Sequence, residues 1–293
     1  MRRNEWKNFG EAMLYMLPAL VILGIFLFYP MIMTVIYSLS ETSPRGEVLS
    51  FVGLENYWQW MQSSQFIQSM KSTFIFTLLT VPTTVVLALY LAVLGNEKLK
   101  GIAFFRVLFS STMGVSVAAG AAIWLFLFHP SLGVFNEFLR FFGAEGIPWL
   151  TSSTYAIYSV AITTVWMNVG ICFIILLGGL QNISDELYDS SKIDGAGYFQ
   201  RLFKITIPML SPTLFFVSTI TLINSFQSFG QIHILTGGGP NQSTNVIVYS
   251  IYREAFEFAR FGTASSQAVI LFFIILLVTF LQFKFGERRV HYQ

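Results

Sequence analysis

The sequence predicts an all-α polytopic membrane protein with six transmembrane helices. Hydrophobic residues make up 54% of the 293 residues and charged residues only 11%, against about 25% charged residues in an average soluble domain. The apolar residues gather in six runs long enough to cross a membrane, which takes about 20 residues. None of the six runs contains Asp, Glu, Lys, Arg or His, so the ionisable side chains lie between or beside them.

The six expected spans cover residues 13–38, 72–94, 107–128, 155–180, 205–232 and 263–283. A basic segment, residues 1–7, precedes the first span. That span is too long for the apolar core of a signal peptide, and no small-residue cleavage site follows it. We therefore expect a retained first helix and a single transmembrane domain over residues 1–293.

The distribution of Lys and Arg predicts the orientation, because cytoplasmic segments carry an excess of both residues. With the N-terminus in the cytoplasm, 12 of the 17 basic residues lie in cytoplasmic segments and 5 in external ones. The opposite orientation would invert this bias. Both termini are therefore expected in the cytoplasm.

The expected external loop at 41–71 is rich in aromatic residues, among them Phe51, Tyr57, Trp58 and Trp60. Two interpretations remain open for this loop. Its aromatic rings either anchor it at the lipid–water interface, where Trp and Tyr are enriched, or contact an external partner.

Several function classes are disfavoured by the composition. A net charge of +2 gives no reason to expect nucleic acid. The single cysteine, Cys172, lies in an apolar run and is expected to be a buried filler. Three histidines without ligand spacing disfavour a metal site or a membrane enzyme. A proton-coupled transporter normally needs an ionisable group inside a span, and the nearest candidate is His233 at a span edge.

The most informative segment is the expected cytoplasmic loop at 181–207. Ser184 or Asp185 is suited to begin a helix, and Gly195 and Gly197 are expected to end it after about three turns. A second helical stretch at 198–207 has an apolar face. The residues on that face are Phe199, Leu202, Phe203 and Ile207. We expect a helix–turn–helix joined to spans four and five, able to transmit force from a soluble partner.

This segment resembles the EAA motif of the permease subunits of ABC importers. The matching residues are Asp189-Ser190-Ser191, Asp194-Gly195-Ala196-Gly197, Phe199, Phe203, Ile205 and Pro208. Asp replaces the motif's Glu and Ser its Ala, while the Ile-Asp-Gly-Ala-Gly core is intact. The resemblance implies a coupling helix that docks into a groove on a separate ATPase subunit. The residues it assigns to ATPase coupling are Asp189, Ser190, Ser191, Lys192, Asp194, Gly195, Ala196, Gly197, Phe199 and Phe203.

A second resemblance lies at residues 233–244, where Leu-Thr-Gly-Gly-Gly-Pro is similar to a segment of sugar-type permeases. With the aromatic first span and the Arg-Val-His-Tyr-Gln ending at 289–293, the likeness to maltose and glycerol-phosphate uptake permeases covers nearly the whole chain. It implies a type I importer transmembrane domain in the bacterial cytoplasmic (inner) membrane. The implied partners are a second, usually different, permease subunit, a periplasmic or extracellular substrate-binding protein, and two ATPase subunits. Those ATPase subunits would bind ATP and Mg, so this chain needs no cofactor and is not itself an enzyme.

Uncharged polar side chains in spans four and five are candidates for binding a sugar, whose hydroxyls exchange hydrogen bonds with amides and whose apolar face stacks on rings. The candidates are Thr164, Trp166, Asn168, Asn224, Ser225, Gln227 and Ser228. The resemblance implies sugar contacts at four of them, Thr164, Asn168, Ser225 and Ser228. Hydrogen bonding between helices is the alternative role. The spans lack Arg and Lys, which favour phosphate binding, so a neutral oligosaccharide is preferred over the alternative, glycerol 3-phosphate or another polyol.

Overall fold

The computed structural model describes residues 2–286, with side chains from residue 12 onward except at position 285. The basic ending noted above, at residues 289–293, lies outside the described residues. Contacts divide the chain into two compact units. The first holds the residues up to 63 together with 251–272, and the second holds 64–250 together with the residues from 273 onward.

The first unit begins with a long, nearly continuous helix and ends with part of the last one. Its elements are α1 (Arg2–Leu23), a π-helical turn (Gly24–Phe28), α2 (Tyr29–Ser38), β1 (Ser40–Thr42), β2 (Val48–Phe51), α3 (Glu55–Met61), a π-helical turn (Arg253–Glu257) and the start of α15 (Phe261–Gly286). The two strands form an antiparallel hairpin with a bulge between Glu41 and Thr42. The sequence predicted only a loop here.

The side chain of Asn56 holds α3 to this hairpin, because it donates to the carbonyls of Ser38 (3.1 Å) and Ser40 (3.0 Å). The aromatic residues of the loop are divided between two environments. Trp60 is buried, at 3% exposure, whereas Phe51 and Trp58 are exposed. Only the exposed rings are therefore available to lipid or to a partner.

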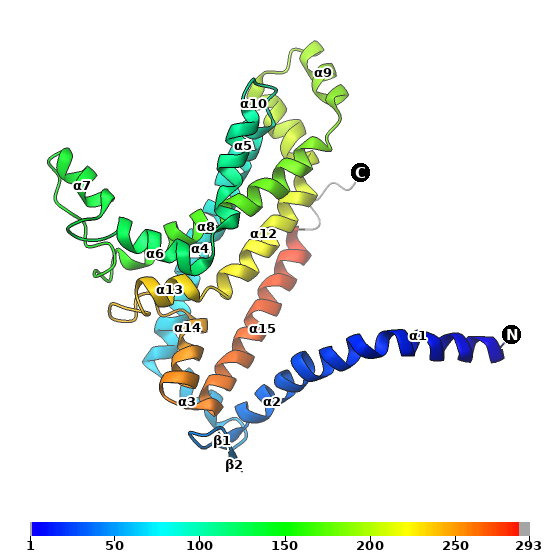
Figure 1. Ribbon diagram of the computed structural model, residues 1–293, viewed down its shortest axis with the longest axis vertical. Coiled ribbons are helices and arrows are strands. Elements are labelled where there is room, and N and C mark those ends of the chain that lie inside the picture. The colour runs from blue at the N-terminus through cyan, green and yellow to red at the C-terminus, as the bar shows by residue number, and fades with distance from the viewer. Residues whose placement is uncertain (1, 287–293) are drawn as a thin grey trace. The chain divides into compact units, whose positions relative to one another are not determined.

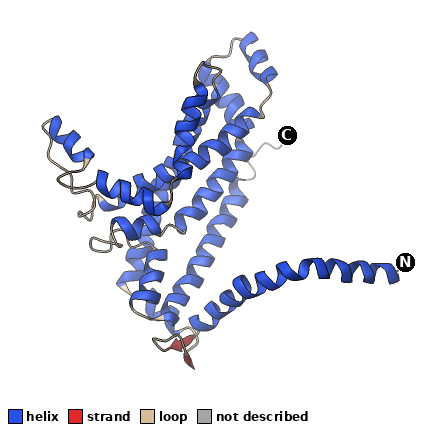
Figure 2. Ribbon diagram, in the orientation of Figure 1, coloured by secondary structure: helices blue, strands red, loops and turns tan. Residues whose placement is uncertain are grey.

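The second unit contains most of the helices (Figures 1 and 2). They are α4 (Ser64–Asn96), α5 (Ile102–Ser110), a 3₁₀ turn (Ser111–Gly114), α6 (Val117–Leu127), α7 (Val134–Phe141), α8 (Ala156–Gln181), α9 (Asp185–Ile193), α10 (Tyr198–Arg201), a π-helical turn (Leu202–Thr206), α11 (Ile207–Met209), α12 (Ser211–Phe226), α13 (Gly230–Leu235) and most of α14 (Ile247–Tyr252), whose last two residues belong to the first unit.

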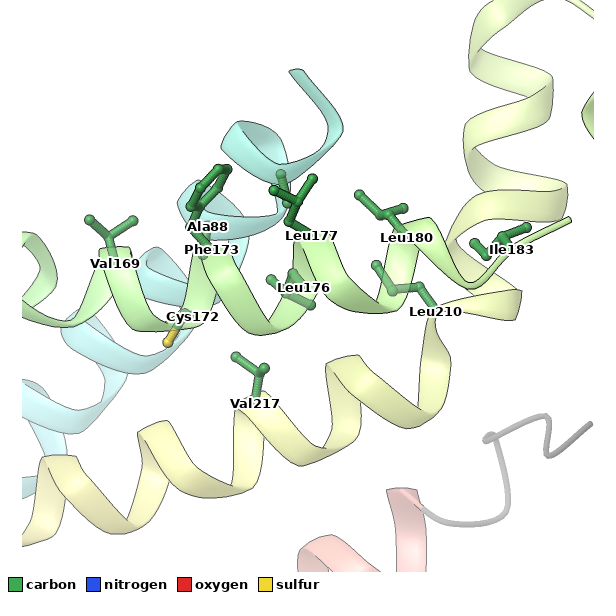
Figure 3. Packing of buried hydrophobic residues seen from close by; sticks show 11 residues of the cluster. Ala88, Val169, Cys172, Phe173, Leu176, Leu177, Leu180, Ile183, Leu210 and Val217 are labelled. Carbon is green, nitrogen blue, oxygen red and sulfur yellow. The ribbon is translucent and has the colours of Figure 1, made fainter. Parts of the chain in front are cut away.

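Helix α8 is the centre of the second unit. Of its apolar window 61% is buried, against 22% for α4. Two alanines of α4, Ala88 and Ala92, are fully buried, and such small residues let helices approach closely. Figure 3 shows the cluster in which Phe173 and Leu176 of α8 pack between α4 and Val217 of α12. Cys172 is buried in this cluster, as predicted.

Four helical segments are long and apolar enough to cross a membrane: Ala12–Ser38, Ser64–Gly95, Ala156–Gln181 and Phe261–Lys284. Two bent pairs raise the number to six if each pair is one span. The first pair, Ile102–Gly114 with Val117–Leu127, bends by 103°, and the second, Tyr198–Met209 with Ser211–Phe226, bends by 69°. The expected spans three and five are therefore not straight helices.

Local chemistry explains both bends. Val115 is extended, and the hydroxyl of Ser116 accepts from the backbone N–H of Ala119 (3.2 Å), so α6 begins anew with its own cap. Pro212 stands at the start of α12. It has no N–H for a helical bond, and its ring crowds the preceding turn. The fifth expected span also stops early, because α12 ends at Phe226 rather than at residue 232.

Candidate functional site

The segment between α8 and α12 folds as a helix, a glycine turn and a second helix. The hydroxyl of Ser184 caps α9 by accepting from the backbone N–H of Glu186 (3.2 Å). Gly195 follows the helix with a φ of +77°, a left-handed conformation that glycine adopts without steric cost. Gly197 returns to an extended conformation and begins α10. This arrangement matches the helix–turn–helix expected from the sequence.

Two polar contacts fix α9 against neighbouring segments, and a third lies within the helix. The Tyr188 hydroxyl lies 3.1 Å from the hydroxyl of Thr206 and joins α9 to the turn before α11. Lys98, in the loop after α4, donates to Asp185 over 2.8 Å. This hydrogen bond raises the pKa of Lys98 above its ordinary value. A second bond of 2.8 Å, from Lys192, lowers the pKa of Asp189.

The coupling residues predicted from the sequence lie mostly on the surface of this segment. Exposed are Asp189, Ser190, Lys192, Asp194, Gly195, Gly197, Phe199 and Phe203. Ser191 is buried and Ala196 half-buried. Phe199 and Phe203 are 71% and 63% exposed. The predicted single apolar face is divided, since Leu202 and Ile207 are half-buried while the two rings point outward.

Sequence reasoning missed one apolar residue on this surface. Ile193, the last residue of α9, is 87% exposed. The sequence signal that could have identified Ile193 was its position directly before Asp194 and the glycine turn. A cavity of about 330 Å³ lies beside the segment. Its charged lining residues are Glu97, Lys98, Asp185, Asp189, Lys192 and Arg201.

A second cavity, of about 420 Å³, lies between the middle of α8, the first bend at residues 112–117, and the end of α12 with the residues that follow it. Four predicted substrate residues line it: Asn168, Asn224, Gln227 and Ser228. Because α12 ends at Phe226, Gln227 and Ser228 stand on an irregular turn. Among the described residues, the side-chain amides of Asn224 and Gln227 are exposed and have no hydrogen-bond partner. They are therefore free to bind a ligand.

The other three predicted substrate residues do not line this cavity. Thr164 is buried and accepts a hydrogen bond from the amide of Gln231 (3.1 Å). Ser225 is buried and donates to the hydroxyl of Thr77 (3.1 Å). Trp166 lines a separate apolar cavity, where it packs edge-on against Trp124. For Thr164 and Ser225 the structure favours the helix–helix role.

The structure adds residues that the sequence did not single out. Thr112 and Gln231 also line the second cavity. Each is a polar residue within an expected span, so a signal existed, but nothing in the sequence distinguished it from its neighbours. The lining of this cavity contains no ionisable side chain. Within residues 2–286, no group of three or more His, Cys, Asp and Glu residues is placed to hold a metal ion.

A helical membrane domain with a polar, uncharged cavity beside its central helix, and with an exposed helix–turn–helix between two apolar helices, has the architecture of a membrane transport subunit. Residues 57–292 match the family of binding-protein-dependent transport system inner membrane components. The chain belongs to this family.

Relatives and solved structures agree with this assignment. The chain is 33% identical to the sn-glycerol-3-phosphate transport system permease protein UgpA of Pectobacterium atrosepticum, over 99% of this chain and 97% of that protein. It is 33% identical to the UgpA protein of Rhizobium meliloti over the full length of both. Its fold is similar to a chain of a bacterial ABC transporter involved in the import of the acidic polysaccharide alginate. The TM-score is 0.83 at 24% identity, covering 97% of this chain and 99% of that chain.

These findings confirm the predicted fold class and family. The chain is a multi-pass permease subunit of an ABC importer in the inner membrane. As a component of a binding-protein-dependent system it works with a substrate-binding protein, and in this family ATP is bound by a partner ATPase. The orientation of the termini, the single-domain organisation and the roles of individual residues stay predictions.

Proposed function

We propose that this permease subunit carries a neutral sugar or oligosaccharide through the cavity between α8 and α12. The observation that carries the proposal is the lining, in which the amides of Asn168, Asn224 and Gln227 lie near the ring of Phe229 and no charged group is present. Amides exchange hydrogen bonds with hydroxyls in both directions. A neutral polyhydroxylated compound therefore fits this surface.

A phosphorylated polyol is the second candidate. It is favoured by the names of the relatives, which are permeases for sn-glycerol 3-phosphate. Phosphate is normally bound by Arg, Lys or backbone N–H groups. The cavity lining contains no Arg or Lys, so a neutral substrate fits the cavity better than a phosphorylated one.

The segment at 181–207 supports a coupling role within the same proposal. It is joined covalently to α8 and α12, which line the cavity, and it exposes Ile193, Phe199 and Phe203. We expect these side chains to dock on one of two ATPase subunits, and a second permease subunit to supply the other half of the pathway. Closure of the ATPase pair would then move α8 and α12 and alternate access to a substrate delivered by the binding protein.

The proposal is tested on the whole importer in proteoliposomes. We expect ATPase activity to rise with binding protein loaded with a neutral oligosaccharide, and not with glycerol 3-phosphate. Asn224→Ala combined with Gln227→Ala should lower oligosaccharide uptake while the complex stays assembled. Gln59→Ala is the matched control, because Gln59 is exposed on α3 and bonded to Glu55. Stimulation by glycerol 3-phosphate alone would contradict the neutral substrate and support the second candidate.

A further inference from the structure

Helix α7 presents an apolar stripe that no described residue of its own unit covers. Val134, Phe138 and Phe141 follow one another at the spacing i, i+4, i+7, which places them on one face of a helix. They are 53%, 63% and 84% exposed, and Leu132 and Phe142 beside them are also exposed. The function proposed above uses none of these residues.

The opposite face of α7 is fixed by one buried side chain. Asn136, only 1% exposed, donates to the carbonyls of Pro130 and Ile147 (both 3.1 Å). Its side-chain oxygen accepts from the backbone N–H of Ile147 and the indole of Trp149 (both 2.9 Å). All four hydrogen-bonding positions of the amide are occupied. The stripe therefore cannot turn inward without breaking these bonds.

The same contacts set the level of α7 along the membrane-spanning helix α8. The carbonyl of Trp149 accepts a hydrogen bond of 2.8 Å from Ser159, in the first turn of α8. Trp149 also packs edge-on against Tyr155, directly before that helix. Trp and Tyr gather where a span leaves the hydrocarbon. Helix α7 is thus tied to the N-terminal end of α8, whereas the 181–207 segment follows the C-terminal end of that helix (Figure 1).

The charges of α7 are neutralised within the loop. Arg140 pairs with Glu137 and donates to the carbonyls of Ser131 and Pro130. The stripe itself therefore offers only apolar groups. Helix α6, which precedes α7, also exposes apolar side chains, among them Ile123 and Phe126, and in a membrane-spanning domain such side chains face lipid or a second subunit.

We propose that α7 is an interfacial helix whose stripe inserts into the lipid leaflet on the side opposite the 181–207 segment. Eight residues span about 12 Å as a helix, too little to cross a bilayer, so the helix lies in the interface plane. A water-soluble partner would meet no polar group on this stripe, although protein interfaces are about as polar as other surfaces. Lipid is therefore the occupant that the contacts favour, and it anchors the outer ends of α6 and α8.

The test uses the assembled importer in vesicles of phosphatidylethanolamine and phosphatidylglycerol, with a bimane probe on Phe138→Cys or Phe141→Cys. Glu137→Cys is the matched control, because Glu137 lies on the polar side of the same helix. The native Cys172 is buried, which confines labelling to α7. ATPase activity stimulated by the binding protein verifies folding, and Val134→Cys gives the same readout should one labelled variant be inactive.

We expect lipid brominated near its headgroup to quench the probes at 138 and 141 several-fold more than the probe at 137. Aqueous iodide should show the reverse order. Equal quenching of all three probes by iodide would place the stripe in water and overturn the proposal. Protection of 138 and 141 from both quenchers would show that a protein subunit covers the stripe, which also overturns it.

Discussion

The two polar cavities of this permease differ in chemistry, one lying at the C-terminal end of α8 and the other beside the middle of that helix. The cavity beside the 181–207 segment, here called the charged cavity, is lined by six charged side chains. The cavity between α8 and α12, here called the neutral cavity, has no ionisable residue in its lining. Exposed charges at a water-facing surface cost little. A charge within the membrane is expensive unless it is paired or solvated. Under the function proposed above, the first surface would meet a soluble protein and the second would pass a neutral solute.

The two sites also depend on different kinds of structure. The turn after α9 depends on one backbone conformation, at Gly195. The neutral cavity depends on residues near positions 112, 168 and 227 that only the fold brings together. A substitution that alters the backbone conformation at Gly195 should therefore disable the 181–207 segment. The neutral cavity should be disabled only by substitutions that change its lining side chains.

The largest effect is expected for Gly195→Val. The left-handed conformation at φ +77° costs about 1–2 kcal/mol for an ordinary L-residue, and more for a β-branched one. The space around a new Cβ is open at this position, so the penalty is conformational. The turn should change shape, displace Phe199 and Phe203, and abolish both ATPase co-purification and uptake.

Gly197→Ala is the control for this prediction. Its φ is −69°, which alanine adopts without strain, and the space around its Cβ is also open. This variant should retain assembly and most of its uptake. Normal transport by Gly195→Val would show that the turn does not position the docking surface.

The structure of the 181–207 segment was predictable because its sequence signals are local. The cap at Ser184 and the break at Gly195 lie within a dozen residues of each other and act on their own backbone. The neutral cavity was predictable only in part. Asn168, Asn224, Gln227 and Ser228 were identified, but Thr112 and Gln231 belong to distant segments whose meeting is a property of the fold.

The bends were missed for a related reason. Mean hydropathy depends only on how many apolar residues a segment contains and carries no information about the direction of the backbone. The apolar run at 107–128 was therefore predicted as one span. The extended Val115, the cap at Ser116 and the ring of Pro212 set that direction. The hairpin of β1 and β2 is stabilised from α3 by Asn56, and two short strands carry little periodicity of their own.

An intermediate effect is expected for Thr164→Val, which tests whether Thr164 holds helices together or binds substrate. The change keeps the shape but leaves the buried amide of Gln231 without its 3.1 Å partner. Buried hydrogen bonds between membrane helices contribute about 1 kcal/mol. The thermal stability of the purified complex should fall modestly, with the substrate preference unchanged. Asn224→Ala should instead change the substrate preference and leave the thermal stability nearly unchanged. A changed substrate preference in Thr164→Val would show that Thr164 contacts the substrate.

The smallest effect is expected for Lys98→Gln, because Lys98 and Asp185 are 83% and 74% exposed and water and salt screen such pairs. The raised pKa of Lys98 keeps this pair charged until the pH rises through that value. The lowered pKa of Asp189 keeps its pair with Lys192 charged until the pH falls through that value. From about pH 5 to about pH 9 both pairs therefore persist.

Salt rather than pH should accordingly modulate the charged cavity. In the native importer, the ATP hydrolysed per substrate imported should stay level across that pH window and rise as salt is added. Lys98→Gln should raise this ratio slightly at low salt and remove part of its salt dependence, whereas Lys100→Gln, an exposed neighbour, should leave both unchanged. A ratio that changes steeply between pH 5 and pH 9 would mean that some titrating group other than the Lys98–Asp185 pair holds α9 against the loop after α4.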